Sequence, residues 1–202
     1  WKPVKFISIV LRGMNNQRKK LAKKDKRFKE NLPLRIFNKI TVGLLKLISL
    51  LPFWFIYLLS DFLNFFVQYI FRYRRNVIFD NLHHAFPEKK ENEIEQIARK
   101  FYRHFTDLML ETIKLHSMSA KQMDKHITFK GVKKFEEYYE QGKSIIILAM
   151  HHNNWEWCSF VQTKGRQLGL MIYNPIRGNE AMEKFLLHSR EKWGGKCIPV
   201  NR

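Results

Sequence analysis

The stretch SIIILAMHHNNWEW, residues 144–157, joins an apolar run to a polar and aromatic cluster. The run at 145–149 is rich in isoleucine and follows Gly142, which predicts a buried β-strand. The cluster behind it contains His151 and Glu156. Open α/β sheets present reactive groups where a strand turns into a helix. The sequence therefore predicts a functional site at this junction.

His151 and Glu156 suit general-base chemistry if their side chains meet. A carboxylate can hold one imidazole nitrogen and leave the other free to accept a proton. Residues five apart in a regular helix lie about 140° apart around its axis. A contact therefore requires His151 in the turn and Glu156 in the first helical turn. The alternative is structural, with His151 capping the helix or satisfying a backbone group.

The sequence around this stretch predicts an α/β fold with a partial parallel sheet flanked by helices. Apolar periodicity predicts helices and further strands, the helices at 88–116, 132–141, 157–168 and 180–193 and the strands at 170–173 and 196–200. The β-α-β-α-β order from the strand at 145–149 onward implies parallel pairing. Because the chain stops directly after the last strand, we expect the domain to be incomplete at its carboxyl end.

Residues 47–71, LISLLPFWFIYLLSDFLNFFVQYIF, carry a single charge, on Asp61. The length matches the roughly 20 residues that cross a bilayer. Pro52 and Asp61 disfavour a simple span, because the first kinks a helix and the second is costly in lipid. Three interpretations remain: a kinked transmembrane helix, a pair of interfacial helices, or the core helix of a soluble protein.

The chain of 202 residues has 37 Lys and Arg against 18 Asp and Glu, a formal net charge of +19. This surplus indicates an anionic partner, which can be a nucleic acid, an acidic protein or a phosphate-bearing lipid. The two cysteines form no CxxC pair, and no metal site is predicted. We expect a basic amino-terminal appendage at 1–38, a membrane-associated hydrophobic helix at 39–75 and a catalytic domain at 76–202.

Three blocks of the sequence resemble one protein family. MHHNNWEW at 150–157 resembles the HFGNWE-type signature of the lysophospholipid-acyltransferase-like superfamily, and more narrowly that of the lipid A biosynthesis late acyltransferases. The block from LPFWF to AFPEK at 51–89 is similar to that family's amino-terminal region. The block from YNPIRG to GGKCI at 173–198 is similar to the region behind the catalytic motif. The resemblance covers roughly residues 40–202.

The resemblance implies transfer of a fatty acyl chain from acyl carrier protein to a hydroxyl of a lipid A precursor, without a cofactor and without a covalent enzyme intermediate. His151 would deprotonate the hydroxyl, and Glu156 would orient and charge-balance His151. Asn154 and Trp155 would line the substrate site, although Trp155 is almost as well explained as core filler. Arg190 would contact an anionic head group or the donor, and its alternative is an exposed surface cation.

Two departures from the family pattern stand out. Asn153 and Asn154 occupy the turn where members have a small residue. Asn174 stands between Tyr173 and Pro175, where many members have an arginine expected to contact phosphate. Either Arg177 substitutes for that arginine or the phosphate site is weakened.

The expected partners are acyl carrier protein, a lipid A precursor and the phospholipid membrane. The expected location is the bacterial inner membrane, with the catalytic domain on the cytoplasmic face. Nucleic-acid binding would explain the charge, but it would leave the apolar segment 47–71 and the His–Glu cluster without a purpose. A glycerophospholipid acyltransferase and a catalytically degenerate membrane-associated relative remain the alternatives.

Overall fold

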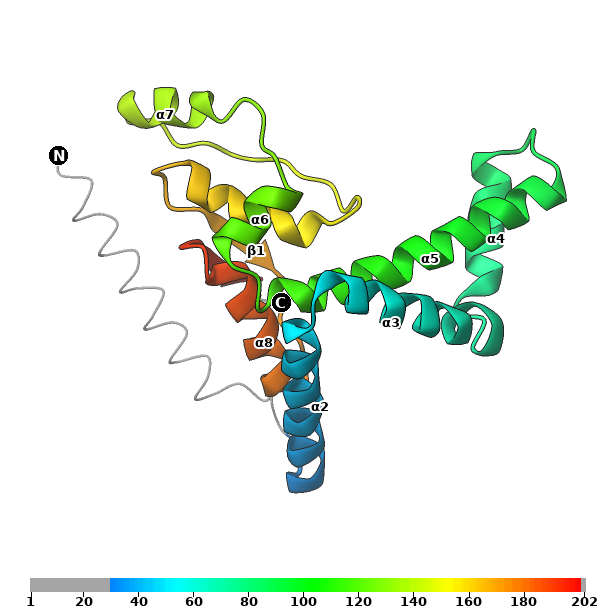
Figure 1. Ribbon diagram of the computed structural model, residues 1–202. Coiled ribbons are helices and arrows are strands. Elements are labelled where there is room, and N and C mark those ends of the chain that lie inside the picture. Colours follow the sequence, from blue (N-terminus) through cyan, green and yellow to red (C-terminus); the bar gives the residue numbers. More distant parts are fainter. Residues whose placement is uncertain (1–29, 201–202) are drawn as a thin grey trace.

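The computed structural model describes residues 30–200, which form three arms that meet at one junction (Figure 1). One arm pairs α2 (Leu32–Leu50) with α8 (Glu180–Glu191). The second contains α3 (Phe53–Phe65), its π-helical extension η2 (Phe66–Ile70), α4 (Arg75–Ala85) and α5 (Glu91–Leu115). The third contains α6 (Ala120–His126), α7 (Lys133–Glu140) and the 3-10 helix η3 (Trp155–Lys164). A parallel pair of strands, β1 (Leu170–Tyr173) and β2 (Lys196–Pro199), flanks α8 in sequence.

The apolar segment 47–71 is two helices that meet at Pro52, not one continuous span. Leu51 is extended, with ψ 147°, as residues before proline generally are. The buried ammonium of Lys114 on α5 donates to the carbonyl oxygens of Ser49 (2.9 Å) and Leu51 (2.7 Å). Because these carbonyls end α2 without helical partners, Lys114 fixes the bend. α2 and α3 diverge from this point (Figure 1).

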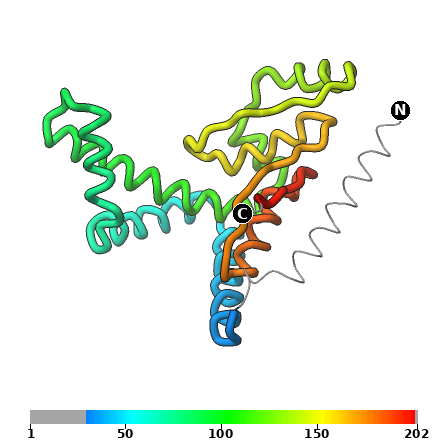
Figure 2. Tube along the Cα trace, turned by 180° about the vertical axis from the view of Figure 1, so that it is seen from behind, coloured from blue at the N-terminus to red at the C-terminus, as the bar shows by residue number. Residues whose placement is uncertain are grey.

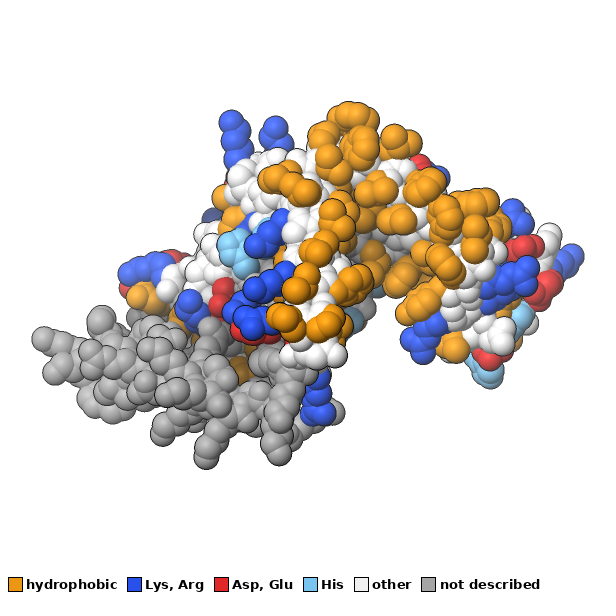
Figure 3. All heavy atoms as spheres, turned by 90° about the horizontal axis from the view of Figure 1, so that it is seen from below, with side chains coloured by type: hydrophobic (Ala, Val, Ile, Leu, Met, Phe, Trp, Pro, Cys, Tyr) orange, Lys and Arg blue, Asp and Glu red, His pale blue; other side chains and the backbone are white. Residues whose placement is uncertain are grey.

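α2 and α3 expose a row of large apolar side chains, which we call the apolar face (Figure 3). It includes Phe37, Ile40, Leu44, Leu47, Trp54, Leu58, Phe62 and Phe65. Among the helices described, the continuous helix Phe53–Ile70 has the length and composition needed to cross a bilayer, and 17% of it is buried. An exposed apolar surface of this extent is typical of contact with a membrane or another protein.

The long helix predicted at 88–116 is confirmed as α5 (Glu91–Leu115), and Tyr102 belongs to its buried face. Tyr102 is 1% exposed, whereas its neighbour Phe101 is 43% exposed. The Tyr102 hydroxyl donates to the carbonyl oxygen of Tyr73 at 2.9 Å, so a polar anchor rotates the helix toward Tyr102. At the end of α5, a core cluster forms at the junction of the arms from Leu115, Met118, Met123, Trp157 and Phe160.

The sheet is smaller than predicted. β1 and β2 pair in parallel, with Leu170 opposite Lys196, as the sequence predicts. The strand predicted at 145–149 is not formed: residues 144–150 run as an extended chain without regular structure (Figure 2), all are exposed except the half-buried Ile145, and Leu148 reaches 93% exposure. Strand character needs a partner for the backbone groups, and within residues 30–200 no strand lies beside this segment. The described residues are therefore mostly helical, with one two-stranded parallel sheet.

Of the remaining helices, three were predicted, and α4 and α6 were not. α7 and α8 are confirmed, while the helix predicted at 157–168 is the 3-10 helix η3 and starts earlier. Most of the appendage predicted at 1–38 lies outside the described residues, and α2 already begins at Leu32 within it.

Candidate active site

Residues 151–156, which we call the motif turn, connect the extended segment 144–150 to η3. Asn153 has a left-handed backbone with φ 51°. Asparagine is one of the few residues other than glycine that adopt this conformation readily. Asn153 thus adopts the backbone conformation for which the resembled family has a small residue in this turn. η3 then starts at Trp155 and carries Glu156 in its first turn.

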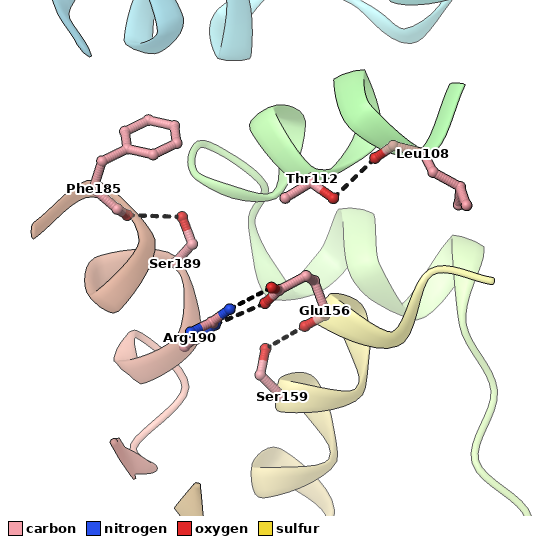
Figure 4. Close-up of polar contacts among 7 residues, drawn as sticks. All are labelled: Leu108, Thr112, Glu156, Ser159, Phe185, Ser189 and Arg190. Carbon is pink, nitrogen blue, oxygen red and sulfur yellow. Dashed lines mark hydrogen bonds and ion pairs between the residues drawn. The ribbon is translucent and has the colours of Figure 1, made fainter. Parts of the chain in front are cut away.

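Glu156 forms a two-pronged ion pair with Arg190 of α8 (Figure 4). Arg190 donates from Nε to Oε2 at 2.8 Å and from Nη2 to Oε1 at 2.5 Å. The side chains of Arg190 and Glu156 are only 16% and 11% exposed. The hydrogen bond to Glu156 raises the pKa of Arg190, so the guanidinium is a permanent cation here. Bidentate pairs of this kind fix both partners geometrically.

His151 does not make the predicted contact with Glu156. Its exposed ring packs on Trp155, with 4.4 Å between ring centroids, and no hydrogen bond joins it to Glu156 among the described residues. A planar guanidinium binds both oxygens of a carboxylate at once, which an imidazole cannot do. Arg190 therefore occupies the carboxylate that the sequence paired with His151.

Trp155 connects the two halves of the site. One ring contact is to His151, and the guanidinium carbon of Arg190 lies 5.5 Å from the Trp155 ring centroid. His151, Trp155, Glu156 and Arg190 are thus brought together. Arg177 is not: it is exposed in the loop after β1 and forms no ion pair with a described residue.

Asn154 turns toward Glu111 on α5, a residue that sequence reasoning missed. The Asn154 amide donates to Glu111 Oε2, and the Tyr57 hydroxyl of α3 donates to Oε1 at 2.7 Å. The Trp157 indole N–H donates to the Glu111 carbonyl oxygen at 3.3 Å. Burial raises the pKa of Glu111. The sequence feature that could have identified Glu111 is its position as the one carboxylate in the apolar last turns of the predicted helix, LMLETIKL at 108–115.

A cavity of about 190 Å³ lies between the motif turn and α5. Its lining comes from Phe105, Leu108, Met109 and Thr112 of α5 and from residues 153–156. The Thr112 hydroxyl donates to the Leu108 carbonyl oxygen at 2.8 Å (Figure 4), which leaves this wall without a free polar group from Thr112. The cavity is apolar on the α5 side and polar at Glu156, an arrangement that suits an apolar chain with a reactive polar end.

Within residues 30–200, no three His, Cys, Asp or Glu side chains converge to hold a metal ion. The chemistry that these residues offer is that of an imidazole, a carboxylate with a fixed guanidinium, and an aromatic surface between them.

Comparison with known proteins gives the following matches. The family model described as bacterial lipid A biosynthesis acyltransferase matches residues 23–202. A lipid A biosynthesis acyltransferase of Haemophilus influenzae is 28% identical over 119 residues, which are 57% of this chain and 36% of that protein. The matched part thus spans about a third of the length of this relative. No solved structure matches the chain.

Proposed function

Because the chain belongs to the bacterial lipid A biosynthesis acyltransferase family, we propose that its motif turn transfers a fatty acyl chain from acyl carrier protein to a hydroxyl of a lipid A precursor. The observation that carries this proposal is the gathering of His151, Trp155, Glu156 and Arg190 beside a cavity with an apolar wall. The acyl chain would lie against α5, which places its thioester carbon at the polar end.

His151 acts as the general base. Its exposed imidazole takes the proton of the acceptor hydroxyl, and the oxygen attacks the thioester carbonyl carbon. A carbon–oxygen bond forms, the carbon–sulfur bond breaks, and the thiolate of acyl carrier protein receives the proton from the imidazolium. A positioned base contributes about 100- to 10,000-fold to the rate of such a step.

The Glu156 carboxylate stabilises the imidazolium that forms on His151. Arg190 is the positioning residue that holds this carboxylate in place. Catalytic hydrogen bonds are often loose without substrate and tighten when it binds. We therefore expect the His151 ring to leave Trp155 and approach Glu156 when substrate fills the cavity. Arg190 keeps the carboxylate fixed during this movement.

The proposed location is the cytoplasmic face of the bacterial inner membrane. The apolar face on α2 and α3 supports this location, and so does the cationic run Arg72, Arg74 and Arg75 behind η2. The large positive charge suits acidic acyl carrier protein and phosphorylated lipid substrates.

The test compares His151→Ala with His152→Ala, its neighbour in the same turn. Each purified variant is incubated with acyl-loaded carrier protein and a lipid A precursor, and the acceptor is weighed by mass spectrometry. We expect His151→Ala to lower the rate about 100-fold or more and His152→Ala to leave it near that of the parent protein. Equal rates for the two variants would refute the role of His151. Acylation of lysophosphatidate instead of the lipid A precursor would assign a glycerophospholipid acyltransferase.

A further inference from the structure

A second and larger cavity, of about 510 Å³, lies between α2 and α8, away from the motif turn. α2 and α8 run side by side in the ribbon and in the Cα trace seen from behind (Figures 1 and 2). The cavity has a size typical of small-molecule sites, about 300–1,000 Å³. Its charged lining residues are the cations Arg35, Lys39, Lys46 and Lys184 and the carboxylates Glu30 and Glu180.

The carboxylates of this lining are already engaged. Glu180 pairs with Lys184 at 2.6 Å. Glu30 accepts from the Asn38 amide and from the backbone N–H of Glu180, both at 3.0 Å. Glu180 also interacts electrostatically with Arg35 and Lys39, so the carboxylates offset part of the positive charge of α2.

Arg35, Lys39 and Lys46 form no ion pair with any residue in the described range 30–200. Their spacing of four and seven positions places them on one face of α2. They line a hollow that holds four Lys and Arg side chains against two carboxylates, an excess of positive charge that an anion would offset. The cations of a solvated surface helix would instead spread over a convex face.

Two imidazoles also belong to the lining of the cavity. His116, at the end of α5, and His188, on α8, both line it, with 4.6 Å between their ring centroids. The groups that face His116 are His188, Lys46 and Lys192. Burial, followed by repulsion from His188 and these lysines, lowers the pKa of His116 to about 4.

The cavity also borders the apolar face. Lys and Arg side chains gather directly beside the apolar side chains of α2 (Figure 3). Long cationic side chains next to an apolar surface reach the phosphate level of a bilayer while the apolar side chains enter it. A charged hollow at this place suits an amphiphile whose phosphate lies just outside the acyl chains.

We propose that the cavity between α2 and α8 binds the phosphate-bearing head group of a membrane lipid, with Arg35, Lys39 and Lys46 contacting the phosphate oxygens. This site does not depend on acyl transfer, because none of its residues belongs to the motif turn. It gives the chain a preference for anionic lipid in addition to the affinity that the apolar face supplies.

The test uses vesicles of phosphatidylcholine with and without phosphatidylglycerol. The variant is Lys39→Gln/Lys46→Gln, and the matched control is Lys133→Gln/Lys134→Gln on α7, which removes the same charge from exposed positions. All four side chains are exposed, so we expect both variants to fold. Each cation at a membrane surface changes affinity about fivefold. We expect the cavity variant to lose about 25-fold in affinity for the anionic vesicles and nothing for the neutral ones, and the control to lose much less.

Equal losses in both variants would overturn the proposal, because they would show attraction by net charge alone. A second measurement follows the His116 ring by NMR. Phosphatidylglycerol in small bicelles should raise the pKa of His116 in the parent protein and leave it unchanged in the cavity variant. If inorganic phosphate raises this pKa and the lipid does not, the cavity takes a soluble phosphate and the lipid assignment is refuted.

Discussion

The ion pair between Glu156 and Arg190 predicts a strong energetic coupling. Arg190→Met keeps most of the apolar stem and removes the guanidinium. Glu156, at 11% side-chain exposure, then loses both hydrogen bonds. Removing one partner of a buried ion pair costs about 3–5 kcal/mol. Because some exposure remains, we expect a loss of about 3 kcal/mol in the free energy of unfolding.

The double variant separates the pair from its surroundings. Glu156→Gln alone leaves the buried guanidinium with a neutral partner, which should cost about 2 kcal/mol. Arg190→Met with Glu156→Gln buries no charge and should be little less stable than Arg190→Met alone. The expected coupling energy in the mutant cycle is therefore about 2 kcal/mol.

Denaturant unfolding in mild detergent, followed by tryptophan fluorescence, measures all four proteins. Arg166→Met is the control, because Arg166 pairs with Glu136 and Glu140 on the exposed surface of the molecule. Such surface pairs contribute little, so we expect no measurable change in its stability. Additive losses in the cycle would refute the reasoning, since they would mean that Glu156 and Arg190 do not depend on each other.

Three further predictions follow from the site and the core. Phe160→Ala should lower the free energy of unfolding by about 3–5 kcal/mol, as denaturant titration would show, because Phe160 is fully buried in the core cluster. Glu111→Gln should cost about 1 kcal/mol and lower the acyl-transfer rate, because the new NH2 group would face a donor, either the Tyr57 hydroxyl or the Asn154 amide, where a carboxylate oxygen had accepted; unchanged kinetics would show that Glu111 does not act on the motif turn. Stability should fall as the pH drops from 6.5 to about 4, because the unfolded chain protonates His116 in this window and the folded chain does not; His116→Gln should flatten the pH dependence of unfolding, and an unaltered slope would contradict this origin.

Local patterns predicted much of the fold. The apolar periodicity at 88–116 and the short strands on either side of α8 were sufficient to place α5, β1 and β2. The break at Pro52 followed from proline chemistry. The face that α5 buries could not be read from periodicity alone, because a tertiary hydrogen bond from Tyr102 fixes the rotation of the helix about its axis. The strand at 145–149 failed for a related reason: sequence shows the apolar run, but pairing depends on which strands lie alongside.

The candidate site shows the same division between local and tertiary information. The motif identified His151, Trp155 and Glu156 as neighbours, because they are close in sequence. It could not show that Arg190, 34 positions away, occupies the Glu156 carboxylate. Nor could it show that Asn154 binds Glu111, since that contact depends on how α5 crosses the motif turn. Each of these partners lies on another helix.

The extended segment 144–150 has consequences for handling the protein. Ile146 and Leu148 are 88% and 93% exposed, and no described strand pairs with the backbone of this segment. An exposed apolar segment with an unpaired backbone can pair with the same segment of another molecule and form an intermolecular β-sheet. We therefore expect residues 30–200 to aggregate over time in concentrated solution. A lysine at position 148 would act as a gatekeeper and extend shelf life, while the packed interior stays as it is.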